Sequence, residues 1–421
     1  MAELTADTAL ITTADGQPLK LKLRQSTRIN RIKAFALVVP LLVFILVTFA
    51  FPLADMLTRS VRDPTVAKLL PRTTEALKAW DGTGQPPDSV YLAIAEEMVA
   101  RRQDRTIGKV AGRLNYEITG ARSLVQKTGR KLARREDLSN AREILTKIDR
   151  RWADPLLWRA IRRLSRPFTL AFYVSALDYT YNAAGKIVAQ PEDRRIYIPL
   201  FLRTLWVSLS ITGFCLLLGY PISYLMATLP LRTSNLLMIM VLLPFWTSLL
   251  VRTTAWVVLL QRQGVINDLL VWFGIIGDNE RLQMIYNMTG TIIAMTHILL
   301  PFMVLPLFSV MKGISPSYVR AARSLGASPA RAFWRVYFPQ TVPGIGAGSL
   351  LVFILAIGYY ITPALVGGRT GQLISNMIAY HMQKSLNWGL ASALGGLLLV
   401  GVLALYWLYN RIVGINNMKL G

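Results

Sequence analysis

Cysteine and histidine are scarce in this chain of 421 residues, which contains one cysteine and two histidines. A single cysteine, Cys215, cannot form an intrachain disulfide, and its place inside an apolar run is typical of a small hydrophobic helix residue. The histidines lie too far from it in the sequence for a metal site with a credible ligand spacing. The chain also lacks the Gly-x-x-x-x-Gly-Lys-Ser/Thr loop that cradles nucleotide phosphates. We therefore expect no catalytic residue, metal site or bound cofactor on this chain.

Charged residues are missing from several long stretches, although 53% of the chain is hydrophobic and its mean hydropathy is only +0.40. These stretches are runs of about twenty apolar residues, long enough for a helix to cross the hydrocarbon core of a bilayer. The pattern predicts an all-α integral membrane protein with six transmembrane helices. The predicted spans are 34–57, 200–229, 236–260, 289–311, 343–366 and 390–413.

The spans divide the chain into five parts. These are a polar leader at 1–33, the first transmembrane helix at 34–57, a polar insert at 58–195, a five-helix core at 196–415 and a tail at 416–421. A secretory signal peptide has an apolar region of only about 7–15 residues close to the N-terminus, so the longer run after a polar leader favours a retained helix. Proline and glycine inside several spans do not exclude crossing, because neighbouring helices satisfy the freed backbone groups.

Lysine and arginine give the chain a formal net charge of +24, and their distribution predicts its orientation. The leader, the 230–235 turn, the 312–342 loop and the C-terminus carry fourteen basic residues near the spans, whereas the two short loops on the opposite side carry four. Because basic residues gather on the cytoplasmic side, we expect both termini in the cytoplasm of a bacterial plasma (inner) membrane. Contact with membrane lipid, rather than with nucleic acid, accounts for the positive charge.

The insert at 58–195 holds 27 basic and 16 acidic residues. The parity of the spans places it outside the cytoplasm. Its charge does not oppose this placement, because loops longer than about 60 residues translocate largely regardless of charge.

Parts of the insert are typical of helices. Asp88 offers an N-cap to the apolar stretch that follows it, and 137–151 is also helix-like. Trp152, Trp158 and Phe168 stand among several arginines. That combination indicates either an interfacial helix or a solvated charged face.

The 312–342 loop carries the most informative motif. Pro316 suits the start of a short helix, and Gly326 suits a left-handed C-terminal cap. Ser328 and Pro329 suit the N-cap and first position of a second helix. Several alanines allow another surface to approach closely, and four arginines without an acid make the loop a cation-rich projection on the cytoplasmic face.

This loop resembles the cytoplasmic loop of ABC importer permeases, whose pattern is Glu-Ala-Ala, three residues, Gly, nine residues and Ile-x-Leu-Pro. Four residues match at that spacing, and Arg320 stands where the family has Glu. The resemblance implies a coupling helix that sits in a groove of a separate ATPase subunit, with ion pairs altered by Arg320. The residues implied in coupling are Arg320, Ala321, Ala322, Gly326, Pro329 and Pro339.

Three further segments look like spermidine/putrescine-type permeases. They are Leu243 to Trp256 (LPFWTSLLVRTTAW), Leu300 to Leu307 (LPFMVLPL) and Thr362 to Gly368 (TPALVGG). This resemblance covers the first span and about 196–415 but not the insert. It implies a second permease subunit, ATPase subunits that bind ATP and Mg, and an external solute-binding protein.

Acidic residues are almost absent from the core, where Asp268, Asp278 and Glu280 are the only ones between Arg194 and Gly421. A cationic polyamine crossing the bilayer is expected to meet carboxylates or aromatic faces. A partner subunit could supply the carboxylates. Polyamine transport is what the resemblance implies, and an amino-acid-like or anionic solute is the alternative.

Five polar residues are candidates for the solute pathway. Arg252, near the outer end of the third span, either lines the path or extends to the interface. His297, in the middle of the fourth span, either contacts solute or is hydrogen-bonded within the bundle. Tyr359, Tyr360 and Thr362 come just before a proline, where a broken helix frees backbone groups that line cavities in transporters. Ordinary helix packing is the alternative for these three.

Two other function classes fit part of the sequence. A secondary transporter or a channel has similar spans but does not need the 312–342 projection. A membrane-anchored binding or sensing protein could use the basic insert but does not need five further spans. The combination favours the transmembrane permease subunit of an ATP-driven importer, with ATP hydrolysed on a separate subunit.

Overall fold

The computed structural model describes residues 19–182 and 185–413. The described chain is mostly α-helical, and the one sheet within it is a two-stranded antiparallel hairpin. The chain divides into two compact units, Met1–Thr58 and Arg59–Gly421, which are taken separately below. The expected tail at 416–421 and the first part of the expected leader lie outside the described residues.

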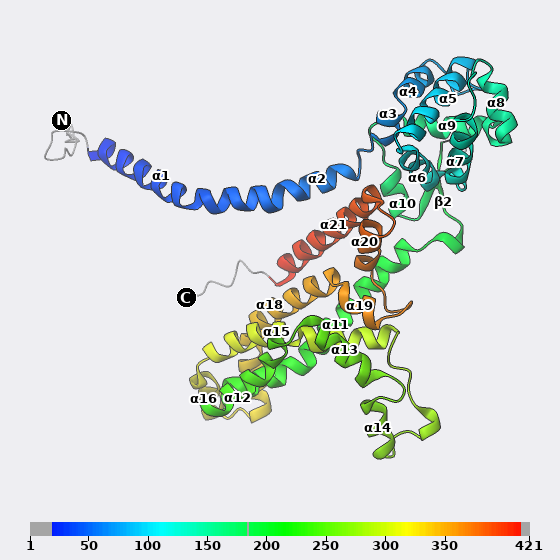
Figure 1. The fold of residues 1–421 in the computed structure, drawn as a ribbon. Coiled ribbons are helices and arrows are strands. Elements are labelled where there is room, and N and C mark those ends of the chain that lie inside the picture. The colour runs from blue at the N-terminus through cyan, green and yellow to red at the C-terminus, as the bar shows by residue number, and fades with distance from the viewer. Residues whose placement is uncertain (1–18, 183–184, 414–421) are drawn as a thin grey trace, which may run out of the picture. The chain divides into compact units, whose positions relative to one another are not determined.

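The described part of the first unit is one long helix, which is apolar over most of its length. It comprises α1 (Leu19–Ile45), the π-helical turn η1 (Leu46–Ala50) and α2 (Phe51–Arg59), as Figure 1 shows. The stretch Ser26–Arg59 contains a window of mean hydropathy 2.8 in which no side chain is buried. The π turn comes just before Pro52, which lacks the N–H that regular α-helical bonding needs. The prediction of a span-length helix at 34–57 is confirmed.

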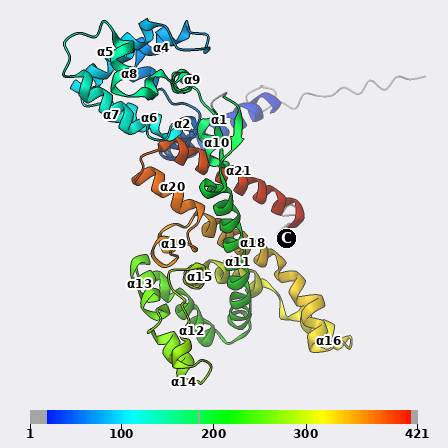
Figure 2. The ribbon, with the colours of Figure 1, turned by 90° about the vertical axis from the view of Figure 1, so that its right-hand side faces the viewer.

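The insert folds into short helices around a hydrophobic core of its own (Figures 1 and 2). Tyr91, Trp152 and Trp158 lie in that core with no exposed surface. Its elements are α3 (Thr65–Leu69), α4 (Pro71–Lys78), α5 (Asp88–Gln103), α6 (Ile107–Glu117), α7 (Ala121–Leu132), α8 (Ala141–Ile148), η2 (Arg150–Ala153), α9 (Pro155–Leu164), α10 (Ala171–Ala176), β1 (Tyr179–Tyr181), β2 (Ile187–Ala189) and η3 (Glu192–Arg194).

The two tryptophans exclude the first of the two alternatives, an interfacial helix. The apolar side of α9 packs into the insert rather than against lipid. Trp158 Nε1–H donates to the Trp152 carbonyl at 2.9 Å, and Trp152 Nε1–H donates to Thr128 Oγ1 at 2.9 Å. Both indole N–H groups are satisfied inside the core, so neither needs a lipid headgroup. Phe168 is the exposed member of the predicted set, at 69%.

Two helix boundaries in the insert also differ from prediction. α5 begins at Asp88 itself, and its N-cap is Pro87 in extended conformation. The helix-like stretch 137–151 is α-helical only over Ala141–Ile148 before a 3₁₀ turn follows. The first boundary moves by one residue, whereas the second helix is shorter than predicted by four residues at its start and three at its end.

The core begins with the long helix α11, and three of its helices form the centre. α11, α15 and α18 pack together around Val207, Met295, Leu299 and Val352. The elements are α11 (Tyr197–Thr228), α12 (Leu231–Leu242), η4 (Leu243–Trp246), α13 (Leu249–Leu260), α14 (Val265–Trp272), η5 (Asp278–Glu280), α15 (Met288–Gly313), α16 (Pro316–Ser324), α17 (Pro329–Ala332), the π turn η6 (Phe333–Tyr337), α18 (Phe338–Gly358), α19 (Ile361–Val366), α20 (Ile374–Gln383) and α21 (Trp388–Val413).

The number of spans agrees with the prediction once one bent segment is counted. Five described helices are long and apolar enough to cross a bilayer, and a bent pair of helices raises the number to six. The five straight spans overlap predicted ones. They are Ser26–Arg59, Tyr197–Thr228, Met288–Gly313, Pro329–Gly358 and Trp388–Arg411.

The third predicted span, 236–260, is wrong as a straight helix. Two helical segments, Leu231–Trp246 and Leu249–Trp272, meet there at 99°. Pro244 has no N–H to donate, which weakens the first segment at its end. Ser248 Oγ then accepts the N–H of Val251 and starts α13 as its N-cap.

The fifth predicted span, 343–366, is misplaced at both ends. α18 continues from α17 through η6, so its helix already begins at Pro329. It ends at Gly358, and the residues that follow Tyr359 and Tyr360 form the separate helix α19.

Within the second unit, the insert packs against the α20–α21 end of the core. Phe172 of α10 belongs to one hydrophobic cluster with Leu390 and Leu394 of α21. Gly389 permits this contact, because a Cβ at that position would lie 2.3 Å from the Phe172 ring. The close approach explains why the first turn of α21 contains a glycine.

A buried carboxylate joins the end of the insert to the start of α11. Asp178 is 2% exposed, and its oxygens accept the N–H groups of Ile196 and Tyr197 at 3.1 Å and of Ile198 at 2.7 Å. A negative charge at a helix N-terminus is favourable. Asp178 therefore stabilises the start of the second span.

A chain of hydrogen bonds makes the second connection. The Tyr116 hydroxyl of α6 donates to the Ser385 carbonyl at 2.8 Å. His381 lies between two hydroxyls, with Nδ1 2.8 Å from Ser385 Oγ and Nε2 2.9 Å from the Tyr197 hydroxyl. Burial lowers the pKa of His381, which keeps the imidazole neutral near pH 7 and able to accept one of these bonds.

Candidate functional site

The loop between α15 and α18 contains the predicted left-handed glycine. Gly326 has a φ of +88°. Its N–H bonds to the Arg323 carbonyl, and the N–H of Ala327 bonds to the Ala322 carbonyl, each at 3.0 Å. These paired bonds are the Schellman pattern that ends a helix and turns the chain.

Both short helices of the loop start as the sequence predicts. Pro316 is the first residue of α16, and Ser315 Oγ accepts the N–H of Ser317 at 3.4 Å. Pro329 is the first residue of α17, with Ser328 as its N-cap. Proline suits this position because the first N–H groups of a helix have no partner within it.

The tip of the loop is apolar and open, and cations surround it. Leu325 is 90% exposed, and Tyr318 and Trp334 are 55% and 62% exposed. Pro339 lies within α18 rather than in the loop proper. The four exposed arginines, which make no ion pair among the described residues, are Arg320, Arg323, Arg331 and Arg335.

Sequence reasoning missed the aromatic cluster that holds this loop. Tyr224 of α11 packs edge-on against Phe333 and Tyr337, with ring centroids 5.7 Å and 5.4 Å apart. Tyr220, one helical turn earlier, meets Phe333 at 6.4 Å. Tyr220 and Tyr224 are four residues apart, as are Phe333 and Tyr337. Aromatic residues at this spacing share one face of a helix, and that was the sequence signal for the cluster. The cluster ties the loop to the second span.

Four of the five predicted pathway residues come together where α13, α15 and α19 meet. Trp256 Nε1–H donates to His297 Nδ1 at 3.1 Å. Thr253 and Thr362 hydroxyls lie 3.4 Å apart. Arg252 lies one turn before Trp256 on α13, and Tyr359 lies two residues before the start of α19.

At the break after α18, two backbone carbonyls accept hydrogen bonds from side chains that the sequence did not point to. Pro363 has no N–H, so the Tyr359 carbonyl lacks its usual helical donor. Ser375 Oγ–H donates to that carbonyl at 2.6 Å, and Asn376 Nδ2–H donates to the Tyr360 carbonyl at 2.8 Å. The freed backbone groups are therefore held by the first turn of α20 rather than open to a cavity. Tyr360 itself is 39% exposed.

An apolar groove of about 470 Å³ runs beside this cluster. Trp256 and His297 form its polar edge, and α11 and α15 supply most of its other side chains. The lining residues are Phe214, Leu218, Trp256, Thr289, Ile292, Ile293, Thr296, His297 and Leu300.

Comparison with known proteins decides the family. The family described as binding-protein-dependent transport system inner membrane component matches residues 219–413. The spermidine/putrescine transport system permease protein PotB of Escherichia coli strain K12 is 35% identical over 221 residues, which make up 52% of this chain and 80% of PotB. This chain belongs to the ABC importer permease family.

Relatives with other names are also similar to this permease. The inner membrane ABC transporter permease protein YdcU of E. coli strain K12 is 29% identical over 280 residues, or 62% of this chain and 87% of YdcU. The molybdenum transport system permease protein ModB of Mycobacterium bovis is 30% identical over 195 residues, or 46% of this chain and 71% of ModB.

Membership of the family confirms the coarse predictions. The permease is a multi-pass inner-membrane component of an importer that works with an ATPase and a binding protein. Its family match begins inside α11, so the insert lies outside the matched residues. The roles of the individual loop and pathway residues stay predictions.

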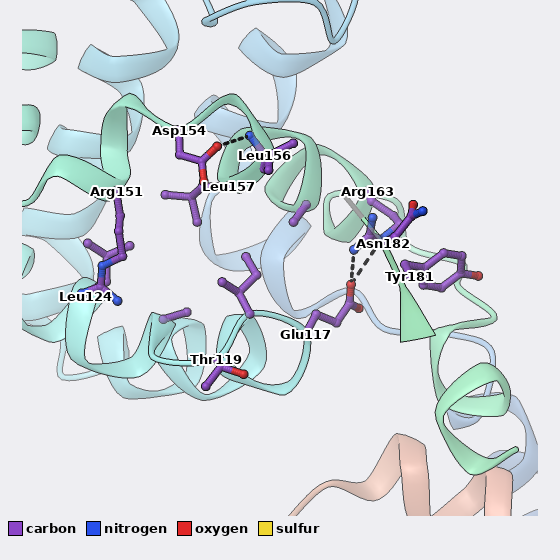
Figure 3. A pocket seen from close by; sticks show the side chains of 13 residues that line it. Glu117, Thr119, Leu124, Arg151, Asp154, Leu156, Leu157, Arg163, Tyr181 and Asn182 are labelled. Atoms are coloured by element: carbon purple, nitrogen blue, oxygen red, sulfur yellow. Dashed lines mark hydrogen bonds and ion pairs between the residues drawn. The ribbon is translucent and has the colours of Figure 1, made fainter. Parts of the chain in front are cut away.

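The insert of this permease contains a second cavity, of about 280 Å³, shown in Figure 3. Its charged side chains already have partners. Arg163 Nη2–H donates to Glu117 Oε2 at 2.8 Å, and Asp154 accepts the N–H of Leu156 at 2.9 Å. Arg151 Nε–H donates to Asp149 Oδ1 at 3.0 Å. This guanidinium keeps the pKa of the Asp149 carboxyl well below its usual range. The cavity therefore offers a ligand little uncompensated charge.

Proposed function

We propose that this permease forms part of the membrane pathway of an importer for a small organic amine of polyamine type. Its loop 312–342 would receive the motion of the ATPase. The observation that carries the proposal is the loop: an exposed apolar tip at Leu325, directly before the left-handed Gly326, at the spacing of the family pattern. The solute class rests on PotB, which is named for spermidine and putrescine transport.

The pathway would run beside α13, α15 and the break after α18. Tyr359 and Tyr360 flank that break and could bind an amine through their ring faces, at about 0.5–2 kcal/mol each. A second permease subunit would complete the pathway and supply carboxylates that this core lacks. An external binding protein would deliver the solute, and ATP and Mg would bind to the ATPase subunits.

The uptake of labelled putrescine and spermidine tests the solute class. The host strain would lack its own copy of this gene and receive either the wild type or a Tyr359→Leu, Tyr360→Leu variant. Leucine keeps most of the apolar volume, so assembly should persist while uptake falls several-fold. Polyamine uptake unaffected by the double change removes both tyrosines from the pathway. Co-purification of an ATPase and a second permease tests the subunit composition.

The proposed orientation places both termini in the cytoplasm and the insert outside. Single cysteines at Ser123 and Ser328, in a Cys215→Ser background, should react with an impermeant thiol reagent from opposite sides of the membrane. Both positions are exposed, and Cys215 is buried. Labelling of both from one side would reject this orientation.

A non-polyamine solute is the second candidate, favoured by a specific observation. The five unbroken described spans contain no acidic residue apart from Asp55 in the first, and Asp268 is the one acid in the bent pair. ModB, a relative named for molybdenum transport, has another kind of cargo. Putrescine uptake that fails beside an intact complex would favour this candidate.

A further inference from the structure

Arg252 is a cation inside the core whose side chain has no partner among the described residues. It lies in the first turn of α13, partly buried, and its Nε has neither solvent contact nor a hydrogen bond. Among the described residues no carboxylate forms an ion pair with it. An arginine in a membrane-spanning region is costly, and such residues mark substrate paths or pair with other groups.

Arg252 lies one turn before Trp256 on α13, and the neighbouring helix α15 presents polar groups that include hydrogen-bond donors. His297 Nδ1 accepts from the Trp256 indole, so the neutral imidazole carries its proton on Nε2. That Nε2–H has no partner among the described residues. Thr296 Oγ1, on the same groove, is buried and also without a partner.

The core's few acids cannot neutralise this cluster. Asp268 in α14 and Asp278 in the loop after α14 both pair with Arg281, at 2.7 Å and 2.8 Å. Glu280 Oε2 accepts the N–H of Gly277 in the same loop. An additional cation would therefore be repelled at Arg252, whereas an oxyanion would find a full charge and several donors.

We propose that Arg252 and the Nε2–H of His297 form a subsite for an oxyanion group of the transported solute. The solute is then amino-acid-like: a short aliphatic chain with an amine and a carboxylate or phosphonate. The apolar side of the groove, with Phe214 and Leu218, takes the aliphatic part. This inference rests on the second candidate under the proposed function, a non-polyamine solute, and it needs the α13–α15 region to line the pathway.

Two matched probes separate the solute classes. Putrescine and 4-aminobutanoate have chains of similar length and differ at one end, where an amine is replaced by a carboxylate. A third probe, 2-aminoethylphosphonate, carries the other oxyanion. Uptake of each is measured in the host strain without its own copy of this gene, complemented by the full-length permease. The expected result is uptake of at least one oxyanion-bearing probe.

Variants of this permease then locate the subsite. Arg252→Gln should lower that uptake at least tenfold, and Arg252→Lys should retain part of it because the charge remains. His297→Leu should lower uptake several-fold, whereas His297→Gln keeps an N–H donor and should retain more. Arg262→Gln is the matched control, because Arg262 is exposed in the loop after α13. Membrane abundance and ATPase co-purification should stay normal in every variant.

The outcomes distinguish this inference from the proposed function. Uptake of putrescine without either oxyanion-bearing probe, or full uptake by Arg252→Gln, overturns the subsite and leaves the importer in place. Failure of the wild-type chain to co-purify with an ATPase overturns the proposed function itself. A wild-type complex that assembles but takes up neither oxyanion-bearing probe also rejects the subsite.

Discussion

The insert and the core differ in how one buried or partly buried arginine of each is paired. In the insert, Arg113 is 6% exposed and pairs with Asp63 and Glu117, and its guanidinium lies 5.2 Å from the Phe172 ring centroid. In the core, Arg252 makes no ion pair with any residue that the structure describes, and its buried Nε has no hydrogen-bond partner there. The insert thus balances the charge of Arg113 internally, because an unpaired buried charge is costly. The core leaves a charge unbalanced, which is expected where another molecule supplies the partner.

Breaking the insert's buried ion network should give the largest effect. Arg113→Met would leave the Asp63 and Glu117 carboxylates buried with less compensation, at a cost of about 3–5 kcal/mol. Thermal unfolding of the purified chain in detergent, followed by tryptophan fluorescence, measures this, because Trp152 and Trp158 lie in the insert core. Arg122→Met, on the exposed side of α7, is the control and should change little. Equal losses in both variants would contradict the network.

The core's exposed loop should respond differently, losing function rather than folding. Gly326→Val places a β-branched residue at a φ of +88°, which costs about 1–2 kcal/mol. No atom surrounds the position within 4 Å, so the strain is confined to the backbone of the turn. We expect normal abundance, weakened ATPase co-purification and little uptake. Gly313→Val tests a helix-end glycine without positive φ. Wild-type uptake by Gly326→Val would refute the coupling role.

Local cues explain why this loop was predictable from sequence. Pro316, Gly326 and Ser328 act on backbone groups within one helical turn, so their effects do not depend on distant residues. The spans were predictable for a similar reason, since length and hydropathy are properties of one segment. Hydropathy does not register a bend, so it missed the break at Pro244 and Ser248.

The features that sequence reasoning missed depend on residues far apart in the chain. Trp158 among arginines looks the same whether its helix meets lipid or another helix, and only packing against Tyr91 and Trp152 decides. The Ser375 hydroxyl that replaces a missing donor lies 16 residues from Tyr359. The Trp256–His297 bond spans 41 residues. Each needed the three-dimensional arrangement of helices.

A smaller effect is expected at the junction of the two regions. Asp178→Asn keeps the shape and one acceptor oxygen but removes the charge at the N-terminus of α11, for a loss of about 1 kcal/mol. Asparagine also tolerates the positive φ of this residue, so backbone strain does not confuse the result. Hydrogen exchange at 196–200 should quicken. Asp193→Asn, at an exposed position, should leave it unchanged.

The smallest expected effect is at the contact between α6 and the end of α20. Tyr116→Phe removes one hydrogen bond, to the Ser385 carbonyl, and leaves the ring in place. Because Tyr116 is 46% exposed, water can replace part of the bond, and the loss should lie near the lower end of about 0.5–1.5 kcal/mol. The insert's own unfolding should be unchanged, since Tyr116 lies outside its buried cluster. Hydrogen exchange should quicken a few-fold at 380–387 only. Tyr179→Phe, an exposed tyrosine elsewhere in the insert, should have no effect there. If the insert instead melts earlier in Tyr116→Phe, its stability depends on the core, and the contrast between a self-balanced insert and a partner-dependent core would have to be given up.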